Sequence, residues 1–211
     1  MRNADLATIL RIALVLFLLY LVIIKFNAVF CIFLLAVVFV LDGVDGYLAL
    51  REISKGKVSI RMYLDYALGS RREAKKISEL KHSIEKTTRY GPRFDVAGDR
   101  IVEYSFWVVF TFLNIVPLFI LLIVIIRHSI ADAFLGMKGT SAKAKSRIAK
   151  LLYTSNASRA FANILKFVTF SYFILVFVSG YPLIPAYILM ALLVIWLVAR
   201  GSAEVYESFQ E

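Results

Sequence analysis

The chain has 211 residues, 60% of them hydrophobic, and a mean hydropathy of +0.76. These values lie far above those of a soluble domain, and the length suits one domain. The formal net charge of +10 would allow nucleic-acid binding, but the basic residues lie between long apolar segments.

Six apolar segments follow one another along the chain, and each is long enough to cross a bilayer as a helix of about 20 residues. They cover residues 6–25, 28–51, 94–114, 115–136, 159–179 and 183–201. Several are joined by very short linkers, so neighbouring helices are expected to be antiparallel in a compact bundle. We therefore predict an all-α integral membrane protein, with six transmembrane helices in a single domain over residues 1–211.

The basic residues gather in two of the linkers. Residues 51–94 hold twelve of the 25 Lys and Arg, and residues 137–159 hold six more. By the positive-inside rule both linkers, and both termini, are expected in the cytoplasm. Such charge more often fixes topology and contacts anionic membrane lipids than binds nucleic acid, so no nucleic-acid partner is expected. We interpret residues 52–90 as a cytoplasmic insert between the second and third helices.

The first segment carries Arg11 and has no small-x-small cleavage site after it. We therefore expect it to be retained as a membrane helix rather than removed as a signal peptide. A long basic side chain near a helix end can extend its charge to the membrane surface while its stem stays in the lipid. We expect Arg11 to reach the inner surface in this way.

Two aspartates stand near the end of the second segment, where a charge inside hydrocarbon is costly and needs a partner or an ion. Asp42 and Asp45 share one helix face with Gly46 and Ala49, because the spacings are three and four residues. The two small residues leave room for a ligand beside the acids.

The third segment carries a second group of acids. Asp95, Asp99 and Glu103 recur every four residues on one stripe of the predicted helix. Counted from the outer helix ends at 1.5 Å per residue, Asp42 and Asp99 both lie about 21–23 Å deep, and Arg127 about 18 Å. The sequence therefore predicts that three helices bring polar groups to one depth in the cytoplasmic half of the bundle.

Four aspartates facing one another at this depth would repel strongly. Hard divalent cations such as Mg²⁺ take oxygen ligands, so a metal site at Asp42, Asp45, Asp95 and Asp99 would relieve the repulsion. The alternative is that the acids pair with nearby arginines and only hold the helices together.

The acids form part of a longer pattern, with D-x-x-D-G-x-x-A at 42–49 and G-x-x-x-D-x-x-x-D at 91–99. This resembles the signature of the CDP-alcohol phosphatidyltransferase family, D-x-x-D-G-x-x-A-R followed by G-x-x-x-D-x-x-x-D, at seven of its eight positions. The missing position is the arginine, because Leu50 stands there and Arg51 comes one residue later. The insert at 52–90 is also longer than the family's usual interval.

The resemblance implies a membrane enzyme of phospholipid synthesis, a six-helix bundle that forms a homodimer and has its active site facing the cytoplasm. It would move a phosphatidyl or archaetidyl group from a CDP-linked lipid to a small polar alcohol and release CMP, using Mg²⁺ or Mn²⁺. By that analogy Asp42, Asp45 and Asp95 hold metal. Asp99 holds metal or acts as the catalytic base that removes the proton of the attacking hydroxyl.

The same resemblance places small and basic residues around the CDP-lipid. These expected CDP-lipid-binding residues are Gly46, Ala49, Arg51 and Gly91.

Excess basic residues beside the acids indicate that the acceptor carries a phosphate of its own, as glycerol 3-phosphate or an inositol phosphate does. The expected acceptor phosphate-binding residues are Arg93, Arg100 and Arg127. The alternative is that Arg100 and Arg127 pair with Glu103 and Asp132 on their own helices.

Two rival functions stay open at this point. Intramembrane acids also coordinate the cation in ion- or proton-coupled transporters, although these usually carry inverted repeats and broken helices. The missing signature arginine and the long insert would also suit a catalytically silent family member.

Overall fold

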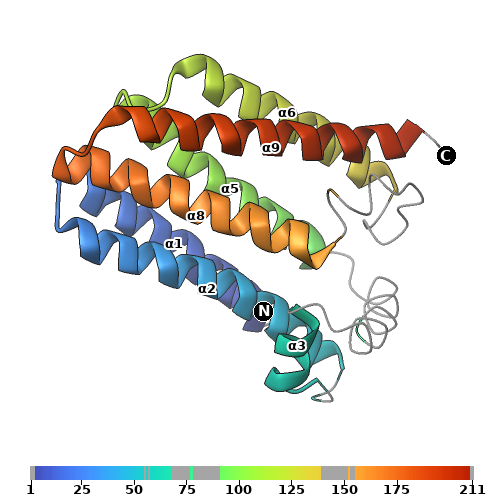
Figure 1. Ribbon diagram of the computed structural model, residues 1–211. Coiled ribbons are helices and arrows are strands. Elements are labelled where there is room, and N and C mark those ends of the chain that lie inside the picture. Colours follow the sequence, from blue (N-terminus) through green and yellow to red (C-terminus); the bar gives the residue numbers. More distant parts are fainter. Residues whose placement is uncertain are drawn as a thin grey trace. The chain divides into compact units, whose positions relative to one another are not determined.

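The computed structural model describes residues 3–54, 56, 58–67, 77, 91–138, 152 and 155–209 (Figure 1). These residues form helices and no strand, which confirms the predicted all-α class. Contacts between residues divide the chain into two units. The first consists of Met1–Ile24 and Val29–Ser105, and the second of Lys25–Ala28 and Phe106–Glu211.

The first unit contains α1 (Asn3–Ile23), α2 (Ala28–Ile53), α3 (Ile60–Ala67) and the first part of α5 (Gly91–Phe112). Helices α1 and α2 run side by side in Figure 1 and begin and end within three residues of the predicted segments. Their ends match the prediction because the ends of a long apolar run define the ends of the helix.

Helix α3 lies inside the predicted insert and packs back against α2. The hydroxyl of Ser54 accepts a hydrogen bond from the backbone N–H of Val58 at 3.2 Å and shapes the turn between them. The ring of Tyr63 then lies 5.6 Å from the ring of Tyr47 on α2. The later part of the predicted insert, residues 68–90, lies outside the described residues except for Ile77.

The second unit contains the end of α5, α6 (Leu118–Lys138), α8 (Asn156–Ser179) and α9 (Leu183–Phe209). Helices α6 and α8 both pack against α9 (Figure 1). Ser155 caps the start of α8 by accepting a hydrogen bond from the Ser158 N–H, and Gly180 ends the helix in the left-handed conformation, with φ of 70°. Glycine adopts this conformation without the steric cost of a Cβ.

Helix α9 is longer than predicted, because it continues through Gly201 to Phe209 instead of ending at residue 201. Glycine weakens a helix by about 1 kcal/mol relative to alanine, which is why it is expected at a helix end. Here Gly201 is buried, and the side chain of Arg127 on α6 packs where a Cβ would be. Packing against α6 therefore outweighs the local preference of glycine.

The core of the second unit is aromatic. The end of α5 supplies Phe106, Trp107 and Phe110, and α8 supplies Phe170 and Phe173, all at most 1% exposed. Ring centroids lie 4.8 Å apart for Phe106 and Phe170, and 5.2 Å apart for Phe110 and Phe173. Large aromatic side chains at these separations bury much apolar area and also attract one another directly.

Four helices in the described part are long and apolar enough to cross a membrane. These spans are Asp5–Ile23, Ala28–Glu52, Ala157–Ser179 and Leu183–Glu207. Between 28% and 39% of the residues in their apolar windows are buried, and large apolar side chains such as Leu16, Phe33 and Ile195 are exposed on them. This surface indicates a membrane protein, as predicted. Helices α5 and α6 are not among the four, and six spans remain a prediction.

Candidate functional site

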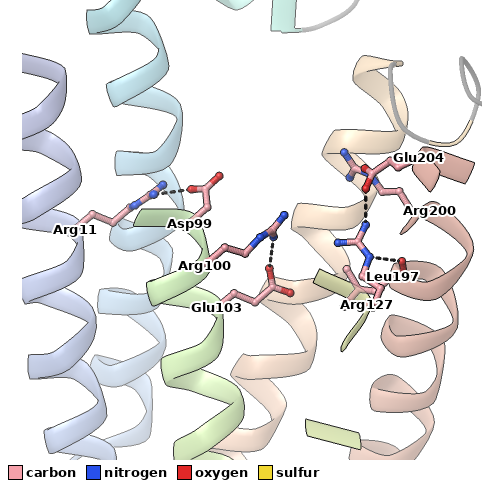
Figure 2. A network of polar contacts seen from close by, with 8 residues as sticks. All are labelled: Arg11, Asp99, Arg100, Glu103, Arg127, Leu197, Arg200 and Glu204. Atoms are coloured by element: carbon pink, nitrogen blue, oxygen red, sulfur yellow. Dashed lines mark hydrogen bonds and ion pairs between the residues drawn. The ribbon is translucent and has the colours of Figure 1, made fainter. Parts of the chain in front are cut away.

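The acids of the first unit meet at a buried arginine. Arg11 on α1 is 1% exposed, and its Nη1 donates a hydrogen bond to Oδ1 of Asp42 on α2. Its Nη2 donates to Oδ1 of Asp99 on α5 at 2.6 Å (Figure 2). The second aspartate of α2, Asp45, has Oδ2 at 3.6 Å from Nη1. We name Arg11, Asp42, Asp45 and Asp99 the Arg11 cluster.

The expectation that Arg11 extends to the membrane surface is therefore wrong. Burying a guanidinium removes it from water, and this cost is offset only by well-placed charged partners. Three carboxylates around one guanidinium provide such partners, so the side chain turns inward. Arg11 was not among the candidate site residues predicted from the sequence.

A glycine allows α1 to approach α5 at this point. A Cβ on Gly98 would collide with the methyl group of Thr8, one turn before Arg11 on α1. It would also lie 3.5 Å from Nη2 of Arg11. The pair Thr8 and Arg11 thus faces α5 at Gly98, and the missing side chain lets the guanidinium reach Asp99.

The acids of the Arg11 cluster differ in exposure. The side chain of Asp45 is 5% exposed, whereas those of Asp42 and Asp99 are 37% and 47% exposed. The cluster is therefore buried around Arg11 and accessible at two of its carboxylates. Its four side chains carry two more negative charges than positive ones when all are ionised.

Carboxylate oxygens and this surplus of negative charge suit a hard divalent cation. Within the described part of the chain, however, no three acidic, histidine or cysteine side chains are close enough to hold an ion on their own. The geometry explains this, because the three acids converge on the guanidinium rather than on a common point between them. The side chain of Asp95, the fourth predicted ligand, lies outside the described part.

The predicted CDP-lipid residues on α2 have different surroundings. A Cβ on Gly46 would lie 2.8 Å from the hydroxyl oxygen of Tyr63 on α3. Ala49 is half-buried, and Arg51 is exposed in the last turn. Leu50, at the position of the missing signature arginine, is 4% exposed and belongs to the core. For Gly91 only the backbone is described, as the first residue of α5.

The predicted acceptor phosphate residues are engaged in ion pairs where their side chains are described. Nη1 of Arg100 lies 3.7 Å from Oε2 of Glu103 on the same helix, which is the pairing that the sequence left open (Figure 2). Arg127 pairs with Glu204 on α9, at 3.2 Å from Nη2 to Oε2. The side chain of Arg93 lies outside the described part.

Arg127 is the centre of a second polar group, which lies in the second unit. Its Nε donates a hydrogen bond to the backbone oxygen of Leu197 at 2.8 Å (Figure 2). Arg200 also approaches Glu204, with Nε 3.7 Å from Oε1. We name Arg127, Leu197, Arg200, Gly201 and Glu204 the Arg127 cluster. Sequence reasoning missed Glu204, because it lies beyond the predicted end of the last helix.

No family model, curated protein or solved structure matches the chain. Any family assignment therefore depends on the motif residues themselves.

Proposed function

We propose that this chain is a membrane enzyme that transfers a phosphatidyl or archaetidyl group from a CDP-linked lipid to a polar alcohol and releases CMP. The motif at 42–49 and 91–99 carries this proposal. In support, Asp42, Asp45 and Asp99 come from two helices and face the same guanidinium. The proposal requires three acids of the motif to converge in this way, and their pairing with Arg11 also holds the helices together.

Under this proposal Asp42, Asp45, Asp95 and Asp99 hold Mg²⁺ or Mn²⁺. The bound cation supplies neutralisation of the charge that develops on the diphosphate as CMP leaves. The surplus negative charge of the Arg11 cluster supports this assignment, because it is what a divalent cation would balance.

The chain's own side chains have separate tasks in this scheme. Arg11 orients Asp42 and Asp99 through its two Nη atoms, at a position that is shielded from water. Asp99 is 47% exposed, so an acceptor hydroxyl can reach it. Under this proposal Asp99 accepts the hydroxyl proton as general base, and its bond to Arg11 holds the carboxylate in position.

The substrates are proposed to lie on either side of these acids. Gly46, Ala49, Arg51 and Gly91 contact the CDP-lipid, and Arg93 and Arg100 attract the phosphate of an acceptor such as glycerol 3-phosphate or an inositol phosphate. The described bonds of Arg127 go to α9 in the second unit, so its place at the acceptor phosphate stays a sequence prediction.

We place the protein in the cell membrane as a six-span homodimer, with both termini and the active site on the cytoplasmic side. The excess of basic residues in 51–94 and 137–159 supports this orientation.

The deciding experiment measures CMP release by the purified full chain in detergent, with CDP-diacylglycerol as donor. Phosphorylated and free forms of glycerol and inositol are compared as acceptors, with Mg²⁺ or with a chelator. We expect release that needs the cation and favours a phosphorylated acceptor. Asp95→Asn should lower it about 10²–10³-fold, the usual cost of losing a group that stabilises developing charge.

Asp65→Asn is the matched control, because Asp65 is an exposed acid on α3 outside the motif. It should release CMP like the unaltered chain. Cation flux into vesicles without CMP release would replace the proposal by a transporter, and absence of both would indicate a silent family member.

A further inference from the structure

The hydroxyl of Tyr63 lies beside Gly46, where the sequence predicted room for a ligand. A Cβ on Gly46 would meet the Tyr63 oxygen at 2.8 Å and the ring carbon that bears it at 3.9 Å, with no third atom within 4 Å. Gly46 therefore has no side chain at the point where α3 inserts a phenol. The space beside the acids is shared between α2 and a residue of the insert.

The position of this hydroxyl is set by packing. The Tyr63 ring lies 5.6 Å from the Tyr47 ring and 6.2 Å from the Tyr66 ring. Val58, just before α3, is 1% exposed, and its N–H is bonded to the Ser54 hydroxyl. Contacts on both sides of the turn thus hold α3 and its phenol against α2.

Gly46 directly follows Asp45 and lies one helical turn after Asp42, so the phenol lies against the segment of α2 that carries these two acids. A diphosphate brought to a group of carboxylates is repelled unless donors or cations face its oxygens. A phenol is a neutral donor that can also form a hydrogen bond without adding charge.

We propose that the Tyr63 hydroxyl donates a hydrogen bond to a phosphate oxygen of the CDP-linked lipid, which makes Tyr63 a substrate-binding residue supplied by the insert. This inference rests on the proposed function, because it takes the CDP-lipid to bind along the Gly46 face of α2. It gives the insert a direct part in recognising the donor substrate.

The first test compares Tyr63→Phe with Tyr66→Phe, which removes a hydroxyl from the same helix at a site away from Gly46. With CDP-diacylglycerol, Tyr63→Phe should raise KM about threefold to tenfold, as expected for one lost hydrogen bond, and leave kcat nearly unchanged. Tyr66→Phe should change neither constant. An unchanged KM in Tyr63→Phe, or an equal rise in Tyr66→Phe, would overturn the inference.

The second test uses Gly46→Ala, whose methyl group must displace the Tyr63 hydroxyl. It should raise KM as Tyr63→Phe does, and the double variant should be no worse than either single variant, since both remove the same contact. Additive effects would show that Gly46 acts on the substrate without Tyr63, and the inference would fail.

Calorimetric binding of CDP separates this inference from the proposed function. If the unaltered chain binds CDP but releases no CMP, the transferase proposal fails. Weaker CDP binding by Tyr63→Phe would in that case still support the contact between Tyr63 and a phosphate oxygen. If the unaltered chain does not bind CDP, both are rejected.

Discussion

Each unit of the chain has a buried arginine beside a glycine, and the two sites differ in what surrounds the guanidinium. Arg11 lies against Gly98, and Arg127 lies against Gly201. In both cases a Cβ on the glycine would collide with the arginine or with a residue beside it. The missing side chain therefore lets two helices approach closely at each site.

The partners of the two arginines are different. Arg11 faces three carboxylates, two of which are more than a third exposed. Arg127 bonds a backbone oxygen and one carboxylate, Glu204, which is 8% exposed. The first site carries surplus negative charge that substrate or cation can reach, whereas the second is closed by its own partners. By this comparison, partly exposed surplus acids distinguish the site proposed for catalysis from an arginine that is held by its own partners.

The largest expected effect tests this contrast directly. Asp99→Asn in the Arg11 cluster should lower CMP release about 10²–10⁴-fold, the range for losing a general base. The free energy of unfolding should also fall, because Asp99 is one of the three carboxylates that offset the burial of Arg11, but Asp42 and Asp45 still face the guanidinium.

Glu204→Gln is the matched change in the Arg127 cluster. It should largely retain CMP release and lower the free energy of unfolding by about 1–3 kcal/mol, because it weakens a buried charged hydrogen bond. An equal loss of CMP release in Glu204→Gln would place both clusters in the chemistry and end the distinction.

A smaller effect is expected from the glycine of the Arg127 cluster. In Gly201→Ala the added methyl would overlap Nε of Arg127 and lie 3.0 Å and 3.1 Å from its Cγ and Cδ. Arg127 is held by its bond to Leu197, so we expect a net loss of about 1–3 kcal/mol in the free energy of unfolding, typical of overpacking.

Denaturant unfolding in one detergent would measure this loss. Gly43→Ala is the control, because a Cβ on Gly43 in α2 would have no neighbour within 4 Å. It should leave stability unchanged or raise it by up to about 1 kcal/mol through helix propensity. Equal stability of the two variants would mean that Arg127 does not pack on Gly201.

The smallest expected effect concerns the glycine of the Arg11 cluster. Gly98→Ala should destabilise the chain through its collision with the Thr8 methyl, and Thr8→Ala should relieve part of that loss. A double-variant cycle should give a coupling free energy of about 0.5–3 kcal/mol, as for residues in direct contact. A coupling near zero would contradict the approach of α1 to α5 at Gly98.

Most of the fold could be predicted where apolar runs are long. Helices α1, α2 and α8 begin and end within three residues of the predicted segments, since length and hydropathy define them. The end of α9 could not be predicted in this way. Its continuation depends on a contact between Gly201 and Arg127, which are 74 residues apart.

The site could be predicted in part. The motif spacing identified Asp42, Asp45 and Asp99, and the structure brings these together. Arg11 was misread, although the same depth count would have found it. It lies 12 residues before Ile23, which is about 18 Å from that helix end and close to the depth of Asp42. No sequence pattern pointed to Tyr63, because its position depends on how α3 packs against α2.

The outward-facing apolar surface has a consequence for what holds the helices together. In water, burying apolar side chains drives helices to associate, but lipid tails are as apolar as the helix surfaces and remove that preference. Since less than two fifths of each apolar window is buried within the protein, association in lipid must come from close fit and polar contact. Gly98 and Gly201 supply the close fit, and the two arginines supply the polar contact. These few non-apolar residues are therefore expected to hold the helices together in lipid.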